Sequence, residues 1–242
     1  MKKKSDFARG LADGLPICLG YLSVAFAFGI FAVGSGLRVW EAALVSMTNL
    51  TSAGQLAAVP IMTGGGSLAE LAASQLVINL RYALMSVSLS QRLDASMTTP
   101  RRLLAAFGNT DEVFAVAVSR PEPVGAPYLY GLILLPFLGW SLGTLAGAAA
   151  GEVLPPLLTA ALGIAIYGMF MAIVIPAARD RRSVAACVLI AAVLSCLCRW
   201  LPPLSAIPQG FAVILCAVAA SAVMAVIAPV EAPEGEEAEK RA

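Results

Sequence analysis

The sequence contains no histidine among its 242 residues, and only 13% of its residues are charged. Histidine is the commonest general base of enzymes and a usual ligand of zinc. Its absence excludes a histidine-based catalytic site and leaves a zinc hydrolase without its usual ligands. The glycine-rich stretch 63–67 also lacks the lysine with which a phosphate-binding loop holds a nucleotide. We therefore expect a protein that is not an enzyme, that uses no metal or cofactor, and that draws its energy from gradients.

Cysteine is also scarce, and its placement argues against a redox role. All five cysteines lie inside apolar stretches, and none forms a C-x-x-C pair. Thiols in such surroundings behave as small hydrophobic groups. We expect packing residues at Cys18, Cys187, Cys196, Cys198 and Cys216.

Apolar residues, in contrast, make up 59% of the sequence, and the mean hydropathy is +0.84. A bilayer-spanning helix needs about 20 mostly apolar residues. We predict an all-α integral membrane protein, a polytopic helical bundle of about seven transmembrane helices in the lipid bilayer, with no nucleic acid partner. Residues 1–230 would form a single transporter domain, and residues 231–242 a disordered acidic cytoplasmic tail. The candidate segments are 15–33, 42–63, 68–90, 126–151, 153–178, 183–198 and 208–230.

Basic residues indicate the side of the membrane on which each loop lies, because short loops keep lysine and arginine in the cytoplasm. Lys2, Lys3 and Lys4 precede the first helix, so we predict a retained first helix and a cytoplasmic N-terminus. The later arginine clusters should also be cytoplasmic. If segment 42–63 spans the membrane as a plain helix, however, three crossings separate Lys2 from Arg92 and place that arginine outside. The clusters are Arg92 with Arg101 and Arg102, and Arg179 with Arg181 and Arg182.

A broken or re-entrant segment 42–63 would resolve this conflict. Its middle carries polar residues and glycine where a lipid-facing helix would carry leucine, and transporters place such breaks at their binding sites. The alternative is a continuous helix whose hydroxyl groups bond back to the preceding turn. The residues concerned are Thr48, Asn49, Thr51, Ser52, Gly54 and Gln55.

One arginine lies near the centre of an apolar segment. Arg81 falls in the middle of segment 68–90, two residues after Asn79. A charge at the centre of a membrane helix costs about 2.5 to 3.5 kcal/mol even on the lenient insertion scale. We therefore expect a partner for Arg81 and a functional role.

Two adjacent acids, Asp111 and Glu112, interrupt the apolar run 103–118, which is short for a span and is typical of a re-entrant or interfacial helix. The acids could follow a helix N-cap at Asn109 or Thr110, where they would meet the positive end of the helix dipole. They could also pair with Arg81, or accept a proton or an ammonium group inside a cavity. Both interpretations can hold together.

Small residues predict close helix packing in segment 126–151. Glycine recurs there every fourth residue, so four positions without side chains share one helix face, and such faces let another backbone approach in lipid. We favour a contact within this chain over a contact with a partner. The residues are Gly139, Gly143, Gly147 and Gly151.

A faint echo between the two halves of the chain indicates an internal duplication, a common feature of transporters. Leu15-Pro16 and Leu135-Pro136 stand in similar surroundings, and residues 55–60 lie in the first half about where residues 170–176 lie in the second.

Several motifs together resemble the AzlC family, the larger subunit of two-component branched-chain amino acid permeases. The resemblance covers roughly residues 7–114. The glutamine motif keeps its glutamine and small residues but lacks the aromatic residue of the family. The motifs are Gly10-Leu11, Leu15-Pro16, Gly20-Tyr21 and residues 25–29 near the start, Leu50 to Leu56 with Gln55, Asn79-Leu80-Arg81-Tyr82, and Gly108 to Ala115 with Thr110-Asp111-Glu112.

The resemblance implies a transporter that exports branched-chain or related apolar amino acids, driven by protons, in a bacterial inner membrane. It also implies a small AzlD-like membrane subunit as partner. The substrate-binding residues would be Thr51, Ser52, Gly54, Gln55, Asn79 and Arg81, and Asp111 or Glu112 would bind the proton or the substrate ammonium. The alternatives are a transporter or channel for another small solute, and a noncatalytic membrane assembly subunit.

Overall fold

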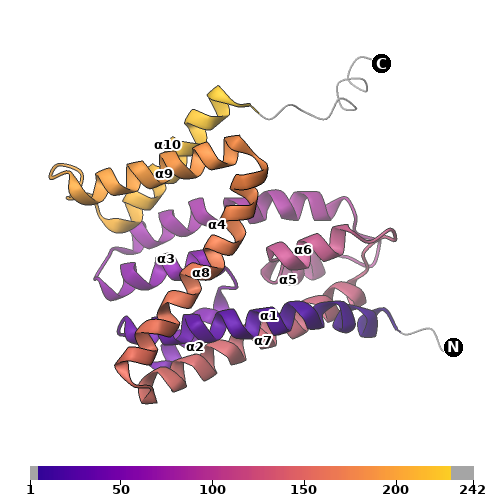
Figure 1. Ribbon diagram of the computed structural model, residues 1–242. Helices are drawn as coiled ribbons and strands as arrows, with labels where there is room; N and C mark the ends of the chain where they lie inside the picture. Colours follow the sequence, from indigo (N-terminus) through magenta and orange to yellow (C-terminus); the bar gives the residue numbers. More distant parts are fainter. Residues whose placement is uncertain (1–4, 230–242) are drawn as a thin grey trace. The chain divides into compact units, whose positions relative to one another are not determined.

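The computed structural model describes residues 5–229, which form ten α-helices and no strand beyond an isolated bridge between Leu93 and Val124. It divides into two compact units, Met1–Phe170 and Met171–Ala242. The helices α1 to α7 and the beginning of α8 belong to the first unit, and the end of α8 with α9 and α10 belongs to the second (Figure 1). The predicted acidic tail, 231–242, lies outside the described residues.

Six helices within residues 5–229 have the length that a membrane crossing requires, which is about 20 residues. Among the residues described in full, α1, α7, α9 and α10 are also apolar enough to cross by composition. The prediction of an all-α membrane protein fits this structure, but the number of long helices is one fewer than the seven segments expected, because segment 42–63 is not among them. The six are α1 (Asp6–Gly34), α4 (Leu68–Ser90), α7 (Ala126–Val153), α8 (Pro156–Asp180), α9 (Arg182–Trp200) and α10 (Gln209–Ile227).

Segment 42–63 is broken in its middle. It consists of α2 (Val39–Thr48) and α3 (Ser52–Thr63), with 10 and 12 residues, so each helix is about half the thickness of a hydrocarbon core of about 30 Å. Val59 of α3 packs in the same core cluster as Ala42 near the start of α2, which two collinear helices could not achieve. The chain therefore turns back at residues 49–51, and α2 and α3 form a re-entrant hairpin whose arms pack mainly on α7 and α4 (Figure 1). The predicted break is confirmed, and the continuous-helix alternative is wrong.

A second hairpin consists of α5 (Thr99–Phe107) and α6 (Asp111–Val118). It enters the first unit from the end opposite to the α2–α3 hairpin (Figure 1). The Tyr130 hydroxyl donates to the Arg101 carbonyl near the start of α5, and Phe107 at its end contacts Phe137, so α5 runs alongside α7. This pairing gives residues 103–118 the re-entrant form that the short apolar run predicted.

The helices α1 and α7 lie side by side and run in the same direction (Figure 1). A Cβ at Gly139 would lie 2.7 Å from the Cys18 carbonyl oxygen, and one at Gly143 would lie 2.6 Å from that of Leu22. A Cβ at Gly147 would collide with the Phe26 carbonyl, whereas one at Gly151 would lie at an ordinary 3.4 Å from Ile30. All four glycines therefore face the backbone of α1, three of them without room for a Cβ, and their partner lies within this chain.

The parallel direction of α1 and α7 also bears on the echo in the sequence. Pro16 lies in α1 and Pro136 lies in α7, so the two similar stretches occupy helices that pack together and point the same way. The internal duplication itself stays a prediction.

The second unit is simpler. Its helices α9 and α10 pack against each other, and the thiols of Cys198 and Cys216 lie 3.9 Å apart between them. No residue of α9 is buried. Neither helix has an internal break, which distinguishes this unit from the first.

Candidate functional site

The tip of the α2–α3 hairpin, Asn49 to Thr51, is held by side chains of α4. Gln75 donates from Nε2 to the Gly54 carbonyl oxygen at 2.9 Å, and Asn49 donates from Nδ2 to Gln75 Oε1 at 3.4 Å. Thr51 donates to the Asn49 side chain at 2.8 Å. A Cβ at Gly54 would lie 2.6 Å from Gln75 Oε1, so glycine gives α4 the room to reach this backbone. The break is therefore satisfied by protein, as irregular backbone at membrane depth requires.

The tip of the α5–α6 hairpin, Gly108 to Thr110, also contacts α4. The Asn109 amide donates from Nδ2 to Ser86 Oγ at 3.2 Å. Arg81 pairs with Asp111, with Nη1 and Oδ2 at 2.8 Å, and the two side chains are 47% and 43% exposed. The predicted pairing of Arg81 with one of the acids is present, and the pair remains accessible to a solute.

The helix-cap interpretation of Asp111 and Glu112 also holds. Thr110 is the N-cap of α6, and both acids lie in its first turn, where they meet the positive end of the helix dipole. The Tyr21 hydroxyl donates to the Glu112 carboxylate, and it lies 2.7 Å from the Thr110 hydroxyl, within hydrogen-bond distance. Glu112 is therefore held by α1, and Asp111 by α4.

A buried chain of polar groups extends from α7 to the first hairpin. Thr144 and Ser46 hydroxyls lie 2.7 Å apart, and Gln55 donates from Nε2 to Ser46 Oγ at 2.9 Å. Trp140 donates from Nε1 to Gln55 Oε1 at 2.9 Å, and its ring meets Tyr21 edge-on at 5.1 Å between centroids. The chain thus joins the first hairpin to Tyr21, which binds the second.

Two buried side-chain oxygens, Asn79 Oδ1 and Asn109 Oδ1, have no hydrogen-bond partner among the described residues, and each asparagine stands two residues before a member of the ion pair. The Asn79 amide is oriented by its neighbours, because Nδ2 donates to Gln75 Oε1 at 3.2 Å and the other end of Gln75 is fixed on the Gly54 carbonyl. An unpartnered buried acceptor costs about 1 to 3 kcal/mol. Such acceptors beside an accessible carboxylate suit a ligand that donates hydrogen bonds.

The structure thus brings most of the predicted residues to the two hairpin tips and α4. Gln55, Asn79, Arg81, Asp111 and Glu112 all take part in the contacts above, and Ser52 is the first residue of α3. The packing glycines of α7 lie along α1 instead. Sequence reasoning missed Tyr21, Ser46, Gln75, Ser86, Trp140 and Thr144. Each of these residues is a polar or amphipathic side chain inside an apolar run. In a single sequence, many residues with a purely packing role look the same.

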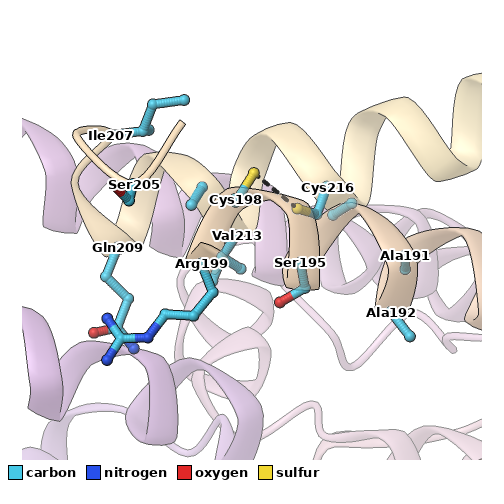
Figure 2. A pocket seen from close by; sticks show the side chains of 12 residues that line it. Ala191, Ala192, Ser195, Cys198, Arg199, Ser205, Ile207, Gln209, Val213 and Cys216 are labelled. Carbon is cyan, nitrogen blue, oxygen red and sulfur yellow. Dashed lines mark hydrogen bonds between the residues drawn. The ribbon is translucent and has the colours of Figure 1, made fainter. Parts of the chain in front are cut away.

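The largest cavity described in the second unit, about 920 Å³, lies between α9 and α10 and is lined largely by small residues (Figure 2). Arg199 and Gln209 are among the polar residues that line it, and the thiols of Cys198 and Cys216 lie 3.9 Å apart in its wall (Figure 2). Two uninterrupted helices form its walls. It shares neither a broken helix nor a charged pair with the site in the first unit.

The comparison with known proteins matches the part of the chain that carries both hairpins. Residues 16–154, more than half of the chain, match the family model described as AzlC protein. The chain belongs to the AzlC family. The matched range extends from α1 to the end of α7, so this AzlC region contains the whole candidate site.

Two relatives support the same assignment over more of the chain. The inner membrane protein YgaZ of Escherichia coli (strain K12) is 30% identical over 186 residues, which cover 74% of this chain and 76% of the relative. An uncharacterized membrane protein of Archaeoglobus fulgidus is 32% identical over 183 residues, 75% of this chain and 80% of the relative. No solved structure matches. The AzlC chain is therefore an integral membrane protein.

Proposed function

We propose that this AzlC-family chain is a transporter subunit that exports branched-chain or related apolar amino acids with proton coupling. It works in a bacterial inner membrane with a small AzlD-like subunit, and residues 1–230 act as one transporter domain. The observation that carries the proposal is the accessible Arg81–Asp111 pair between two hairpin tips that enter from opposite ends. Transporters bind solutes at such broken helices, and charges inside a membrane bundle mark solute pathways.

The topology that we propose has a cytoplasmic N-terminus. Because the α2–α3 hairpin returns to the side from which it enters, only α1 and α4 cross the membrane between Lys2 and Arg92. The same end of the first unit holds Arg9 and Arg120, as well as Arg101 at the start of the second hairpin. A basic end of this kind is cytoplasmic under the positive-inside rule.

An amino acid substrate fits the charges of the site. Its carboxylate can accept hydrogen bonds from the Arg81 guanidinium or from the first amides of α3, and its ammonium can donate to Asp111 and to the unpartnered oxygen of Asn79. A zwitterion thus replaces the Arg81–Asp111 pair with two new pairs. Asp111 or Glu112 is the simplest carrier of the coupled proton, since both are carboxylic acids in or beside the site.

The test is efflux of preloaded radiolabelled leucine from cells that express this chain with an AzlD-like subunit. Replacing Arg81 with alanine removes the partner of the substrate carboxylate and leaves Asp111 unpaired. We expect efflux to fall by about thirtyfold or more, since losing one partner of a charge pair costs about 2 kcal/mol or more. An uncoupler should slow efflux by the wild-type chain.

The matched control is Arg9→Gln. It removes the arginine of another exposed ion pair, Arg9 with Asp6 at 3.8 Å, far along α1 from the hairpin tips. This variant should keep wild-type efflux. Equal efflux from Arg81→Ala and wild type, with both present in the membrane, would show that Arg81 does not take part in transport. Absence of leucine efflux from all three would refute the proposed substrate.

A further inference from the structure

The first unit contains an apolar cavity beside the ion pair. It has a volume of about 190 Å³ and lies between α4, the α5–α6 hairpin and α7. Its walls are mainly aliphatic, and include Leu89, Leu93, Met97, Ala105 and Leu129. Four of these five, Leu89, Met97, Ala105 and Leu129, belong to the buried core of this part of the molecule, so the cavity is built into the fold.

Polar groups lie at the end of this cavity that faces the hairpin tip. Ser86 and Asn109 line it there and are hydrogen bonded to each other at 3.2 Å. Asn109 is only 4% exposed, and its side-chain oxygen has no partner. Buried amide oxygens are nearly always hydrogen bonded, so this one indicates a donor that arrives from outside the chain.

Along the chain, the residues at this end of the cavity are close to the charged pair. Asn109 lies two residues before Asp111, and Ser86 lies five residues after Arg81 on the same helix, an axial rise of about 7.5 Å. A molecule whose charged groups bind Arg81 and Asp111 can therefore extend an aliphatic chain into the cavity. The distance that this molecule must span is no longer than an ordinary amino acid.

We infer that this cavity receives the aliphatic side chain of the transported amino acid, and that Asn109 accepts a hydrogen bond from its ammonium. This inference rests on the proposed function and adds the determinant of side-chain specificity. The size agrees, because a dry apolar cavity of about 150 Å³ holds benzene. A cavity of about 190 Å³ therefore holds the side chain of leucine, isoleucine, valine or methionine, and holds the larger benzyl group of phenylalanine only as a close fit.

Neighbouring residues provide a matched test. Leu103 and Leu104 are similarly exposed on α5, at 71% and 67%, but only Leu103 lines the cavity. Leu103→Ala enlarges the cavity and should raise efflux of phenylalanine relative to leucine by at least about fivefold, because one methylene in an apolar pocket changes selectivity by about tenfold or more. Leu104→Ala should leave this ratio unchanged.

A second variant shifts the selectivity in the opposite direction. Ala106 also lines the cavity and is exposed at the surface, so Ala106→Leu fills the cavity without disturbing the core. It should lower efflux of leucine relative to alanine by about tenfold. The control is Ala115→Leu, at an exposed alanine of α6 that does not line the cavity.

Ratios measured within one variant are independent of how much protein reaches the membrane. Opposite shifts in Leu103→Ala and Ala106→Leu, with both controls unmoved, support the inference. Unmoved ratios in both cavity variants, while wild type exports leucine, would overturn it and leave the proposed function intact; the cavity would then hold a lipid chain or a partner helix. A wild-type chain that exports no amino acid would overturn both.

Discussion

The two units of this protein differ in the continuity of their helices. The first unit breaks two of its segments, and the second unit consists of uninterrupted helices in its described part. The first carries the Arg81–Asp111 pair and a buried chain of polar groups, whereas α9 and α10 contribute a groove lined largely by small residues. The AzlC match ends at residue 154, just before α8.

The difference shows what a break in a membrane helix requires. Each break exposes amides and carbonyls that lipid cannot satisfy, so the fold must provide partners for them. Gln75 performs this task for the first hairpin, and Tyr21 together with Ser86 holds the second. An uninterrupted helix needs none of these groups, which accounts for the mainly apolar and small residues of α9 and α10.

The largest effect should come from the close packing of α1 against α7. Gly147→Leu would force a side chain into the Phe26 carbonyl, and we expect a loss of stability of more than about 3 kcal/mol. Thermal unfolding of the detergent-purified protein, followed by size-exclusion chromatography, measures this loss. Gly168→Leu in α8 is the control, because no atom outside its own helix lies within 4 Å of a Cβ there. Equal melting of the two variants would contradict the packing described.

A smaller effect should follow from cutting the buried polar chain. Gln55→Leu leaves Trp140 Nε1 without an acceptor, at a cost of about 1 to 3 kcal/mol, whereas Ser46 keeps its hydrogen bond with Thr144. Leucine efflux should fall with stability, since Trp140 also supports Tyr21. The same substitution at the exposed Gln209 of the second unit should change stability by less than about 0.5 kcal/mol. Comparable losses of stability at both positions would show that the buried polar chain does not distinguish the first unit from the second.

The smallest effect concerns the second unit alone. The thiols of Cys198 and Cys216 lie 3.9 Å apart, so a short thiol-specific cross-linker should join them, and mass spectrometry of the digested protein identifies the product. Cross-linking should change leucine efflux by less than about twofold, because neither residue lies at the hairpin tips. Cys198→Ser should abolish the product. A cross-linked protein that no longer exports leucine would show that movement between α9 and α10 is part of transport.

The break in segment 42–63 could be predicted from the sequence because polar residues cluster at one point, and Arg81 could be predicted to have a partner because its cost in lipid is high. The return of the chain after the break was indicated only indirectly, by the positive-inside rule applied to Arg92. A segment of this length can also cross the membrane, and its return depends on contacts such as Val59 with the cluster around Ala42. The roles of Tyr21 and Trp140 were hidden for the same reason, since their partners lie on other helices.

Both hairpin tips draw their partners from one helix. Gln75 and Asn79 of α4 serve the first tip, and Arg81 and Ser86 serve the second, so the hydrogen bonds of the two tips are fixed to a single rigid rod. A displacement of α4 by occupancy of one tip must alter the geometry at the other. Thermodynamic linkage makes such coupling reciprocal, so a proton and a solute bound at opposite tips would each change the affinity for the other by the same factor.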